Sequence, residues 1–316
     1  MPNFIHSLRL QVIALLLALG LTPSLLAQTD QSAQINTQQQ VINRQGLENL
    51  GQYAPYQITD TELGEIQLVS RTPRPKMFTF STLQSFNYTT NAFLTQSGER
   101  DAFFWNGRLA ASFVPYATRD FTPRLTFEQD FFRYTRFSRL DFDSQLLQLD
   151  LKFDLTRNDS WFINASYAVS RLYSPRGSQG EFYRYGLANV ALNYLQPLGH
   201  LPLYAFWSLG AYSRHGEPST FDRAAPYLSS AILYRPIEQV EISGFIRPEV
   251  QFYTNDPTSS SRTDFNLSLG SAVAWSPNEY VALGASVAFV GNYSDTGGLS
   301  YNVFSPSIVV GARISF

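Results

Sequence analysis

The side chains best able to do chemistry are charged residues that alternate with apolar ones in two neighbouring stretches, 123–136 and 143–156. Successive side chains of a strand point to opposite faces, so this alternation predicts two strands whose charged residues share one face. The candidates on that face, joined by Arg108 from the preceding stretch, are Arg124, Glu128, Asp130, Asp150, Lys152 and Asp154. They predict a polar wall in which carboxylates and basic groups lie close together.

The pairing of these two stretches decides which charges meet. A hairpin centred near Arg139 places Glu128 opposite Asp150, whereas a slip of two residues places Glu128 opposite Lys152. Directly opposed like charges are destabilising, so cations, protons or basic residues must compensate them. The wall is then either a network of salt bridges that braces a narrow structure or a surface that selects solutes. Further charged residues on other predicted strands would add to either role: Glu241, Arg247, Glu249 and Arg313.

Other chemistry is sparse. Beyond His6 and His200, only His215, with Glu217 and Asp222 nearby, could join a metal or acid-base site, and we expect it to be a solvated loop residue. The chain has no cysteine, which removes disulfides and thiolate chemistry. The common motifs of hydrolases, zinc proteases, nucleotide-binding loops and dinucleotide-binding turns do not occur. The sequence therefore predicts no cofactor, no metal site and no enzymatic activity.

The elements that would position these charges begin at residue 77. From there to the end the chain repeats a pattern of extended segment and turn. We predict twelve strands, at 77–90, 102–116, 123–136, 143–156, 160–173, 182–195, 202–213, 225–235, 239–253, 263–275, 279–293 and 301–316. Their connections alternate between short turns such as TRND and RPIE and longer loops such as TNAFLTQSGERD and RHGEPSTFDRA.

Strand faces follow from the alternation. In 146–155 the apolar positions are odd, in 240–253 they are even, and in 265–275 they are odd again, which leaves charged and polar residues on the opposite face. Pro248 and Pro306 fall inside strands, where each removes a ladder hydrogen bond, so we expect bulges at both. Aromatic residues near the predicted strand ends suggest two belts, and those by the long loops include Phe104, Trp105, Phe132, Tyr134, Tyr173, Tyr183, Tyr185, Tyr227, Tyr253 and Tyr293.

The last strand, YNVFSPSIVVGARISF, indicates how the sheet is completed. Its apolar face carries Val310, Ala312 and Ile314, it ends on Phe316, and its second edge needs cover, which pairing with the first strand would supply. Such a strand resembles the closing strand of bacterial outer-membrane β-barrel proteins. The resemblance implies that these four residues are read by the barrel-assembly machinery and that membrane lipid surrounds the barrel. The fold class is therefore all-β, a single transmembrane antiparallel up-and-down barrel of about twelve strands over 77–316.

Composition agrees with a membrane barrel. Charged residues are 15% of the chain and aromatic residues another 15%, whereas about 25% is charged in an average soluble protein. The formal net charge of −2 argues against nucleic acid as a partner, because phosphate binding needs a basic surface. A lipid-facing belt rich in rings accounts for both percentages.

The N-terminal part differs from the rest. Residues 1–27 have a basic start, an apolar run (VIALLLALGL) and a plausible cleavage site after Ala27, so they predict a signal peptide and export. Residues 28–76 begin with a Gln-rich stretch that cannot bury enough apolar surface to order itself. We expect this polar segment to be irregular and periplasmic. It is a tail, a small plug in the barrel, or an arm that docks on a periplasmic partner.

Function depends on whether the lumen is open. Twelve strands lie between small barrels that side chains fill and porins with wide aqueous channels. The mixed charges favour a narrow channel for small polar or charged solutes in the outer membrane. The alternative is a closed, non-conducting barrel that serves as an anchor or assembly partner. A third and weaker reading, an outer-membrane lipid-acting enzyme, lacks a histidine placed for catalysis.

Overall fold

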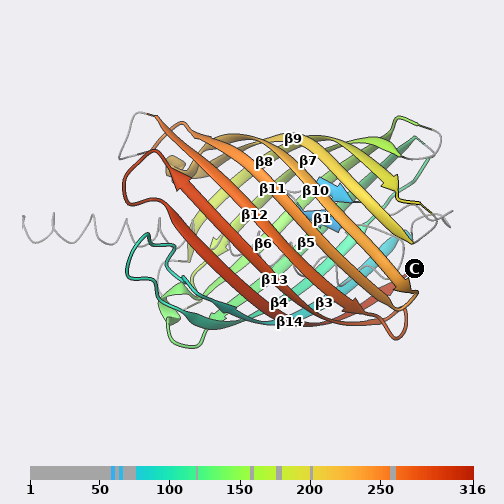
Figure 1. Cartoon of the computed structure of the whole chain (residues 1–316), viewed down its shortest axis with the longest axis horizontal. Helices are drawn as coiled ribbons and strands as arrows, with labels where there is room; N and C mark the ends of the chain where they lie inside the picture. Colours follow the sequence, from blue (N-terminus) through green and yellow to red (C-terminus); the bar gives the residue numbers. More distant parts are fainter. Residues whose placement is uncertain are drawn as a thin grey trace, which may run out of the picture.

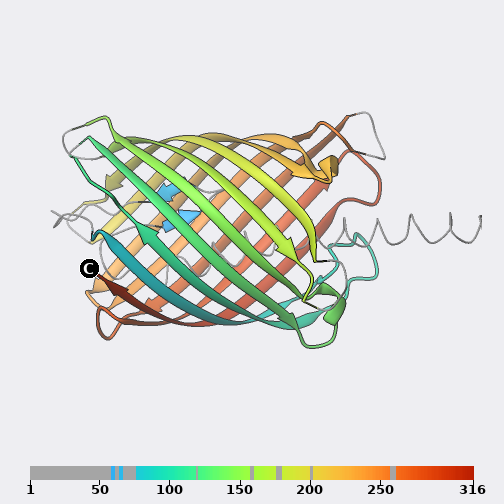
Figure 2. The same cartoon turned by 180° about the vertical axis from the view of Figure 1, so that it is seen from behind.

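The computed structural model describes residues 58–60, 64–66, 76–118, 120–156, 160–175, 180–199, 202–256 and 261–316. Twelve antiparallel strands close into one barrel, in which each strand pairs with its neighbours in sequence and the last pairs with the first (Figure 1). The view from behind shows the same tilted strands completing the ring (Figure 2). The predicted fold class and strand number are confirmed. Among the described residues, none belongs to a helix long and apolar enough to cross a membrane.

The strand positions agree closely with the predicted segments. The barrel strands are β3 (Phe78–Thr89), β4 (Ala102–Phe113), β5 (Phe121–Tyr134), β6 (Phe142–Asp154), β7 (Trp161–Tyr173), β8 (Glu181–Pro197), β9 (Leu203–Glu217), β10 (Arg223–Ile237), β11 (Val240–Tyr253), β12 (Arg262–Trp275), β13 (Val281–Ser294) and β14 (Tyr301–Ser315). The largest differences are at β9 and β10, which extend into the predicted loop RHGEPSTFDRA. That connection is consequently short and contains the 3-10 turn η3 (Ser219–Phe221).

Two further strands lie in the N-terminal part. β1 (Ile58–Asp60) and β2 (Gly64–Ile66) pair antiparallel with each other. The backbone of β2 approaches β7, β8 and β9, and Figure 1 draws both strands in blue within the outline of the barrel. The predicted signal peptide at 1–27, and nearly all of the predicted polar segment at 28–76, lie outside the described residues.

The barrel is closed by β14 and β3. Phe78 and Phe316 exchange backbone hydrogen bonds of 3.2 and 2.9 Å, so every second pair counted from them along this ladder is a hydrogen-bonded pair. Pro306 and Tyr88 form one of these pairs, but Pro306 has no N–H to donate to the Tyr88 carbonyl. Ser305 Oγ donates to the Tyr88 carbonyl oxygen at 2.8 Å instead. The expected bulge at Pro306 is absent because a neighbouring side chain satisfies the acceptor without a change of register.

Pro248 behaves in a similar way. The pairing of β11 with β10 and β12 keeps one register on both sides of Pro248. Where it faces β10, the ladder is interrupted between Ser230–Ile246 and Tyr227–Glu249. The register shift of this strand pair lies between Tyr234 and Ile237, at the short turn. The predicted bulge at Pro248 was therefore wrong, and the strand tolerates one lost hydrogen bond.

The two faces of the wall differ as the alternation predicts. On β6 the odd-numbered apolar residues from Leu147 to Leu155 point outward, while Gln148, Asp150 and Lys152 are buried. β11 and β12 follow their predicted faces as well. On β14, Val310, Ala312, Ile314 and Phe316 all lie on the outer face. An apolar outer belt around a polar interior requires a hydrocarbon environment.

Candidate functional site: the barrel lumen

One side of the lumen is lined by the predicted charged residues of β4 to β6, here called the acidic wall. All of its carboxylate side chains point inward, and Asp130 is fully buried. Arg108 Nε donates to Asp130 Oδ1 at 2.8 Å and lies 3.9 Å from Glu128. The acidic wall comprises Arg108, Arg124, Glu128, Asp130, Asp150, Lys152 and Asp154. The structure thus brings together all seven residues that the sequence assigned to it.

The register of the β5–β6 hairpin differs from both predicted alternatives. Arg124 lies opposite Asp150, and Glu128 lies opposite Leu146 rather than a charged residue. The hairpin is centred two residues earlier than expected, because the turn holds the 3-10 segment η2 (Ser138–Leu140) and the Asp141 carboxylate accepts from the Tyr134 N–H at 2.7 Å. The predicted clash of opposed carboxylates is avoided, since a basic residue faces Asp150.

The rest of the acidic wall is held by short pairs along and across strands. Lys152 Nζ lies 2.7 Å from Asp154 and 5.0 Å from the centre of the Phe162 ring. Gln148 donates to Asp150 at 2.6 Å. Burying charged groups is costly unless each is paired and hydrogen-bonded, so these contacts are needed to keep the wall folded.

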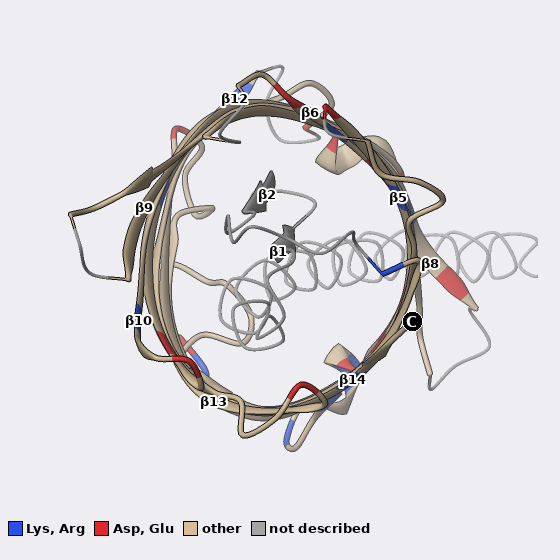
Figure 3. Ribbon diagram, turned by 90° about the vertical axis from the view of Figure 1, so that its right-hand side faces the viewer, with Lys and Arg blue, Asp and Glu red and all other residues tan. Residues whose placement is uncertain are grey.

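The opposite side of the lumen is lined by arginines that stack on tyrosines, here called the arginine-tyrosine wall. Figure 3 shows β10, which belongs to it, across the ring from β5. The guanidinium carbon lies close to the ring centre in three stacks: Arg214 on Tyr185 at 4.4 Å, Arg247 on Tyr227 at 3.9 Å and Arg262 on Tyr253 at 4.2 Å. Such cation-π contacts contribute about 2 kcal/mol when desolvated.

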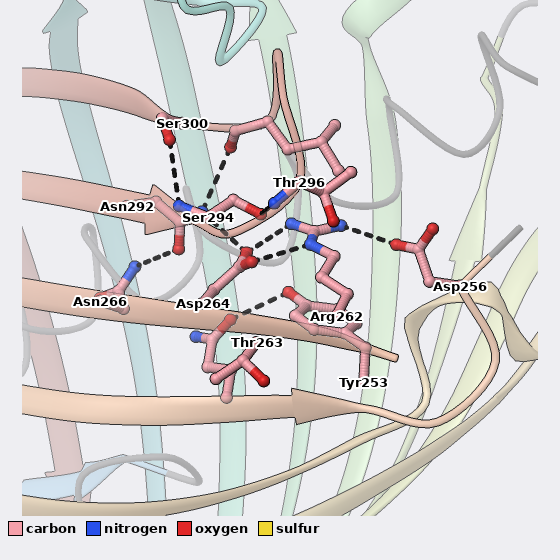
Figure 4. A network of polar contacts seen from close by, with 12 residues as sticks. Tyr253, Asp256, Arg262, Thr263, Asp264, Asn266, Asn292, Ser294, Thr296 and Ser300 are labelled. Carbon is pink, nitrogen blue, oxygen red and sulfur yellow. Dashed lines mark hydrogen bonds and ion pairs between the residues drawn. The ribbon is translucent and has the colours of Figure 1, made fainter. Parts of the chain in front are cut away.

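Hydrogen bonds and an ion pair join the Arg247 and Arg262 stacks into one network across β9 to β13, in which Arg223 also donates to the Tyr253 hydroxyl at 3.4 Å. Arg223 Nε donates to the Tyr212 hydroxyl at 3.1 Å, and that hydroxyl donates to Glu249 at 3.2 Å. Glu249 also lies 3.0 Å from Arg247. Figure 4 shows the part around Arg262, which contacts Asp264 and, at 3.2 Å, Asp256. The guanidiniums of Arg223, Arg247 and Arg262 are thereby held in orientation by their neighbours.

Sequence reasoning found only part of the arginine-tyrosine wall. It assigned Glu241, Arg247 and Glu249 to the lumen, and all three are buried there. It missed Arg214, Arg223 and Arg262 because the predicted strands ended before or began after them. The sequence pattern could have identified them, because each lies two residues beyond the last inward residue of its predicted strand and continues the same alternation. Arg313, on β14, is half-buried and apart from both walls.

The lumen ends near the long loops in an apolar cluster. Residues 91–94 of the β3–β4 loop fold inward and are buried. Asn91 holds this turn by donating to the Thr95 carbonyl at 2.7 Å, and Leu94 adopts a left-handed φ of 51°. Phe93 packs on Phe137 with ring centres 4.8 Å apart. Apolar side chains therefore pack inside the lumen at this end.

The predicted outer aromatic belt near the long loops was wrong for most of its members, because they also point into the lumen. Trp105, Tyr173 and Tyr293 do lie on the outer face. The other members point inward and are buried: Phe104, Phe132, Tyr134, Tyr183, Tyr185, Tyr227 and Tyr253. Neighbouring residues of a strand must face opposite sides, so Phe104 and Trp105 could not share one belt. Most of the expected belt is the lining of the lumen.

The histidine cluster does not form a metal site. His215 lies in β9 rather than in a loop, faces outward, and shares a hydrogen bond of 2.9 Å with Ser213. Its Nδ1 lies 3.7 Å from Asp222, while Glu217 bonds Arg184 instead. Within the described parts of the chain, no three His, Cys, Asp or Glu residues are grouped to hold a metal ion. The absence of enzymatic activity stays a prediction.

Comparison with known proteins identifies the fold. No family model matches the chain, and no curated protein sequence does. An outer-membrane channel from Pseudomonas putida F1 is similar in structure, with a TM-score of 0.52 and 10% identity over 79% of this chain and 100% of that one. The translocator domain of the autotransporter NalP from Neisseria meningitidis matches with a TM-score of 0.44 and 11% identity, over 75% of this chain and 88% of that one. The chain has the fold of bacterial outer-membrane β-barrel proteins, as its closing strand indicated.

Proposed function

We propose that the protein is a narrow channel for small polar or charged solutes in the bacterial outer membrane. The observation that carries this proposal is the opposite charge of the two lumen walls. The acidic wall has three basic and four acidic groups, an excess of −1. Inward groups on β9 to β12 and in the β11–β12 connection comprise five basic (Arg214, Arg223, Arg235, Arg247, Arg262) and four acidic (Glu241, Glu249, Asp256, Asp264), an excess of +1.

Charges of opposite sign across a lumen with low-dielectric walls produce a transverse field, which would orient polar solutes and ions as they pass. Stacking and hydrogen bonds hold the arginines, so they do not collapse onto the acidic wall. A barrel that served only as an anchor would be more stable with apolar residues at these positions.

Single-channel recording in planar lipid bilayers tests the proposal. We expect discrete conductance steps from purified, refolded protein. A heat-denatured sample of the same preparation is the control. Absence of conductance at every voltage would contradict the channel and favour the closed barrel.

The closed barrel remains a second candidate because of the apolar cluster at the long loops. If Phe93 and its neighbours seal the lumen, replacing Phe93 with serine should raise conductance from none to measurable. If they only narrow it, the same variant should increase an existing conductance. Phe103→Ser is a matched control, since Phe103 faces outward in the adjoining strand.

Deleting residues 28–76 distinguishes three roles for the N-terminal segment. A plug predicts higher conductance, and the approach of β2 to β7, β8 and β9 supports this role. An arm predicts loss of a periplasmic partner in pull-down experiments. A tail predicts no change in either measurement.

We also propose that Phe316, with Val310, Ala312 and Ile314, is recognised by the barrel-assembly machinery. Phe316 is 62% exposed, so its removal loses little burial energy within the barrel. Deleting it should nevertheless strongly reduce heat-modifiable protein in the outer membrane. Equal loss on refolding into pure lipid vesicles would indicate a stability effect instead.

A further inference from the structure

The outer face of the barrel is not uniform near the long loops. On the six strands β11 to β14, β3 and β4, aromatic residues are exposed at this level: Phe86, Phe103, Phe252, Phe265, Tyr293 and Phe304. On β5 to β8 charged side chains take their place, among them Arg133, Asp143, Arg171 and Arg184. A membrane protein exposes charge at its lipid face only at some cost in stability, so we expect the outward charges on β5 to β8 to have a function that offsets this cost.

Five of the polar residues form one continuous row, here called the outer polar row. Cross-strand pairing joins Gln129 to Gln145, Gln145 to Arg171, Arg171 to Arg184, and Arg184 to Glu217. The row therefore crosses five consecutive strands, β5 to β9. Each member lies on the outward alternation of its strand.

Two arginines of the row face each other directly. Cross-strand pairs of an antiparallel ladder alternate between hydrogen-bonded and non-hydrogen-bonded pairs. The Leu195 N–H donates to the Ser160 carbonyl at 2.8 Å, so Ser160 and Leu195 form a hydrogen-bonded pair. Counting along the β7–β8 ladder from there, Arg171 and Arg184 form a non-hydrogen-bonded pair, the kind whose Cα atoms approach to about 4.5 Å. Their side chains are 53% and 51% exposed. Like charges placed in this way repel each other, and an anion between them would remove that penalty.

The carboxylates of the protein leave part of this need unmet. Glu217 bonds Arg184 from the end of β9, and its own side chain is 71% exposed. Glu181 lies 3.9 Å from Arg171 Nε, too far for a hydrogen bond. Beside the pair, Gly186 makes room for a ring, because a Cβ there would lie 2.8 Å from the Tyr167 hydroxyl oxygen. The Tyr167 hydroxyl, a second type of donor, thus lies over Gly186, the next outward residue of β8 after Arg184.

We propose that the outer polar row binds the phosphate of a membrane lipid in the leaflet next to the long loops. Guanidinium groups bind phosphate oxygens through two parallel hydrogen bonds, which a lysine cannot reproduce. The row ends at the last residue of β9, and its two arginines lie within three residues of the long-loop ends of β7 and β8, where we place the lipid phosphates. A lipid is the partner, because the arginines open onto the surrounding membrane and not onto the lumen.

Native mass spectrometry of the detergent-solubilised full chain tests this binding. The probes are lipid A and phosphatidylglycerol, with diacylglycerol as a lipid without phosphate. We expect adducts with the first two and none with the third. In Arg171→Gln/Arg184→Gln, adduct occupancy should fall about tenfold, equivalent to about 1.4 kcal/mol. Arg136→Gln is the control, since Arg136 is an exposed arginine in the β5–β6 connection, off the row.

Three outcomes would overturn the proposal. The first is equal lipid retention by the double variant and the wild type. The second is an equal loss in the Arg136→Gln control. The third is displacement of the lipid by millimolar inorganic phosphate, which would indicate a site for soluble anions. Heat-modifiability on gels verifies folding of each variant, and Arg171→Lys, which keeps the charge without the two-pronged geometry, should lose retention even if the double variant does not fold.

Discussion

The two walls of the lumen bury similar numbers of charges by different means. On the acidic wall Arg108 pairs with Asp130 and Glu128, and Lys152 pairs with Asp154 and lies over the Phe162 ring. On the opposite wall Arg247 and Arg262 each have a ring as well as carboxylate partners, as Arg262 has Tyr253, Asp264 and Asp256. Redundant partners make the second wall more tolerant of single changes. We therefore expect single changes on the acidic wall to be tolerated less well.

The largest expected effect comes from removing one carboxylate on each wall. Asp130→Ala removes the 2.8 Å partner of buried Arg108 and leaves Glu128 at 3.9 Å, and breaking a buried charge pair costs about 3–5 kcal/mol. Asp264→Ala should cost less, because Arg262 keeps Asp256 and the Tyr253 ring. Urea unfolding of protein in lipid vesicles measures both. Equal losses would show that the walls do not differ in redundancy.

A charge placed on the outer face should destabilise the barrel equally, whichever wall lies behind it. Leu149 on β6 and Ile246 on β11 both point outward near the middle of their strands. An arginine at either position should cost about 2–4 kcal/mol, whereas Ile314→Arg, near the end of β14, should cost about 0–1 kcal/mol. The same unfolding measurement applies. A large difference between the first two would mean that the outer environments differ as well as the inner ones.

A smaller effect tests the stacks themselves. Tyr227→Leu removes the ring 3.9 Å from the Arg247 guanidinium and the hydroxyl that bonds Asn189 at 3.1 Å. We expect a loss of about 1–3 kcal/mol. Tyr227→Phe keeps the ring, so it should lose only about 1 kcal/mol for the hydrogen bond. If both variants lose the same amount, stacking contributes little to this wall.

The sequence predicted the barrel well because its signal is local. The alternation of Leu147, Leu149 and Leu151 with charged neighbours assigns a face to every residue of β6 without knowledge of the partner strands. The closing role of β14 followed from its uncovered edge. Register was less accessible, because it depends on the turn: the Asp141 cap and η2 shift the β5–β6 hairpin by two residues from its expected centre.

The candidate site was predicted in part. The acidic wall was found because its charges lie in the middle of strands. The arginine-tyrosine wall was largely missed because Arg214, Arg223 and Arg262 stand at strand ends, where turn-forming residues obscure the alternation. The inward fold of residues 91–94 has no sequence signal of its own, since it depends on space inside the completed barrel.

The smallest expected effect concerns ion selectivity, and it depends on the walls' opposite charge. Asp150→Asn reduces the negative charge of the acidic wall, and Arg247→Gln reduces the positive charge of the other, each by one unit. In a conducting channel under a salt gradient, the reversal potential should shift toward anion preference for the first variant and toward cation preference for the second. The double variant should return close to the wild-type value, since its net lumen charge is unchanged. Shifts in the same direction would mean that permeating ions do not pass between these two walls.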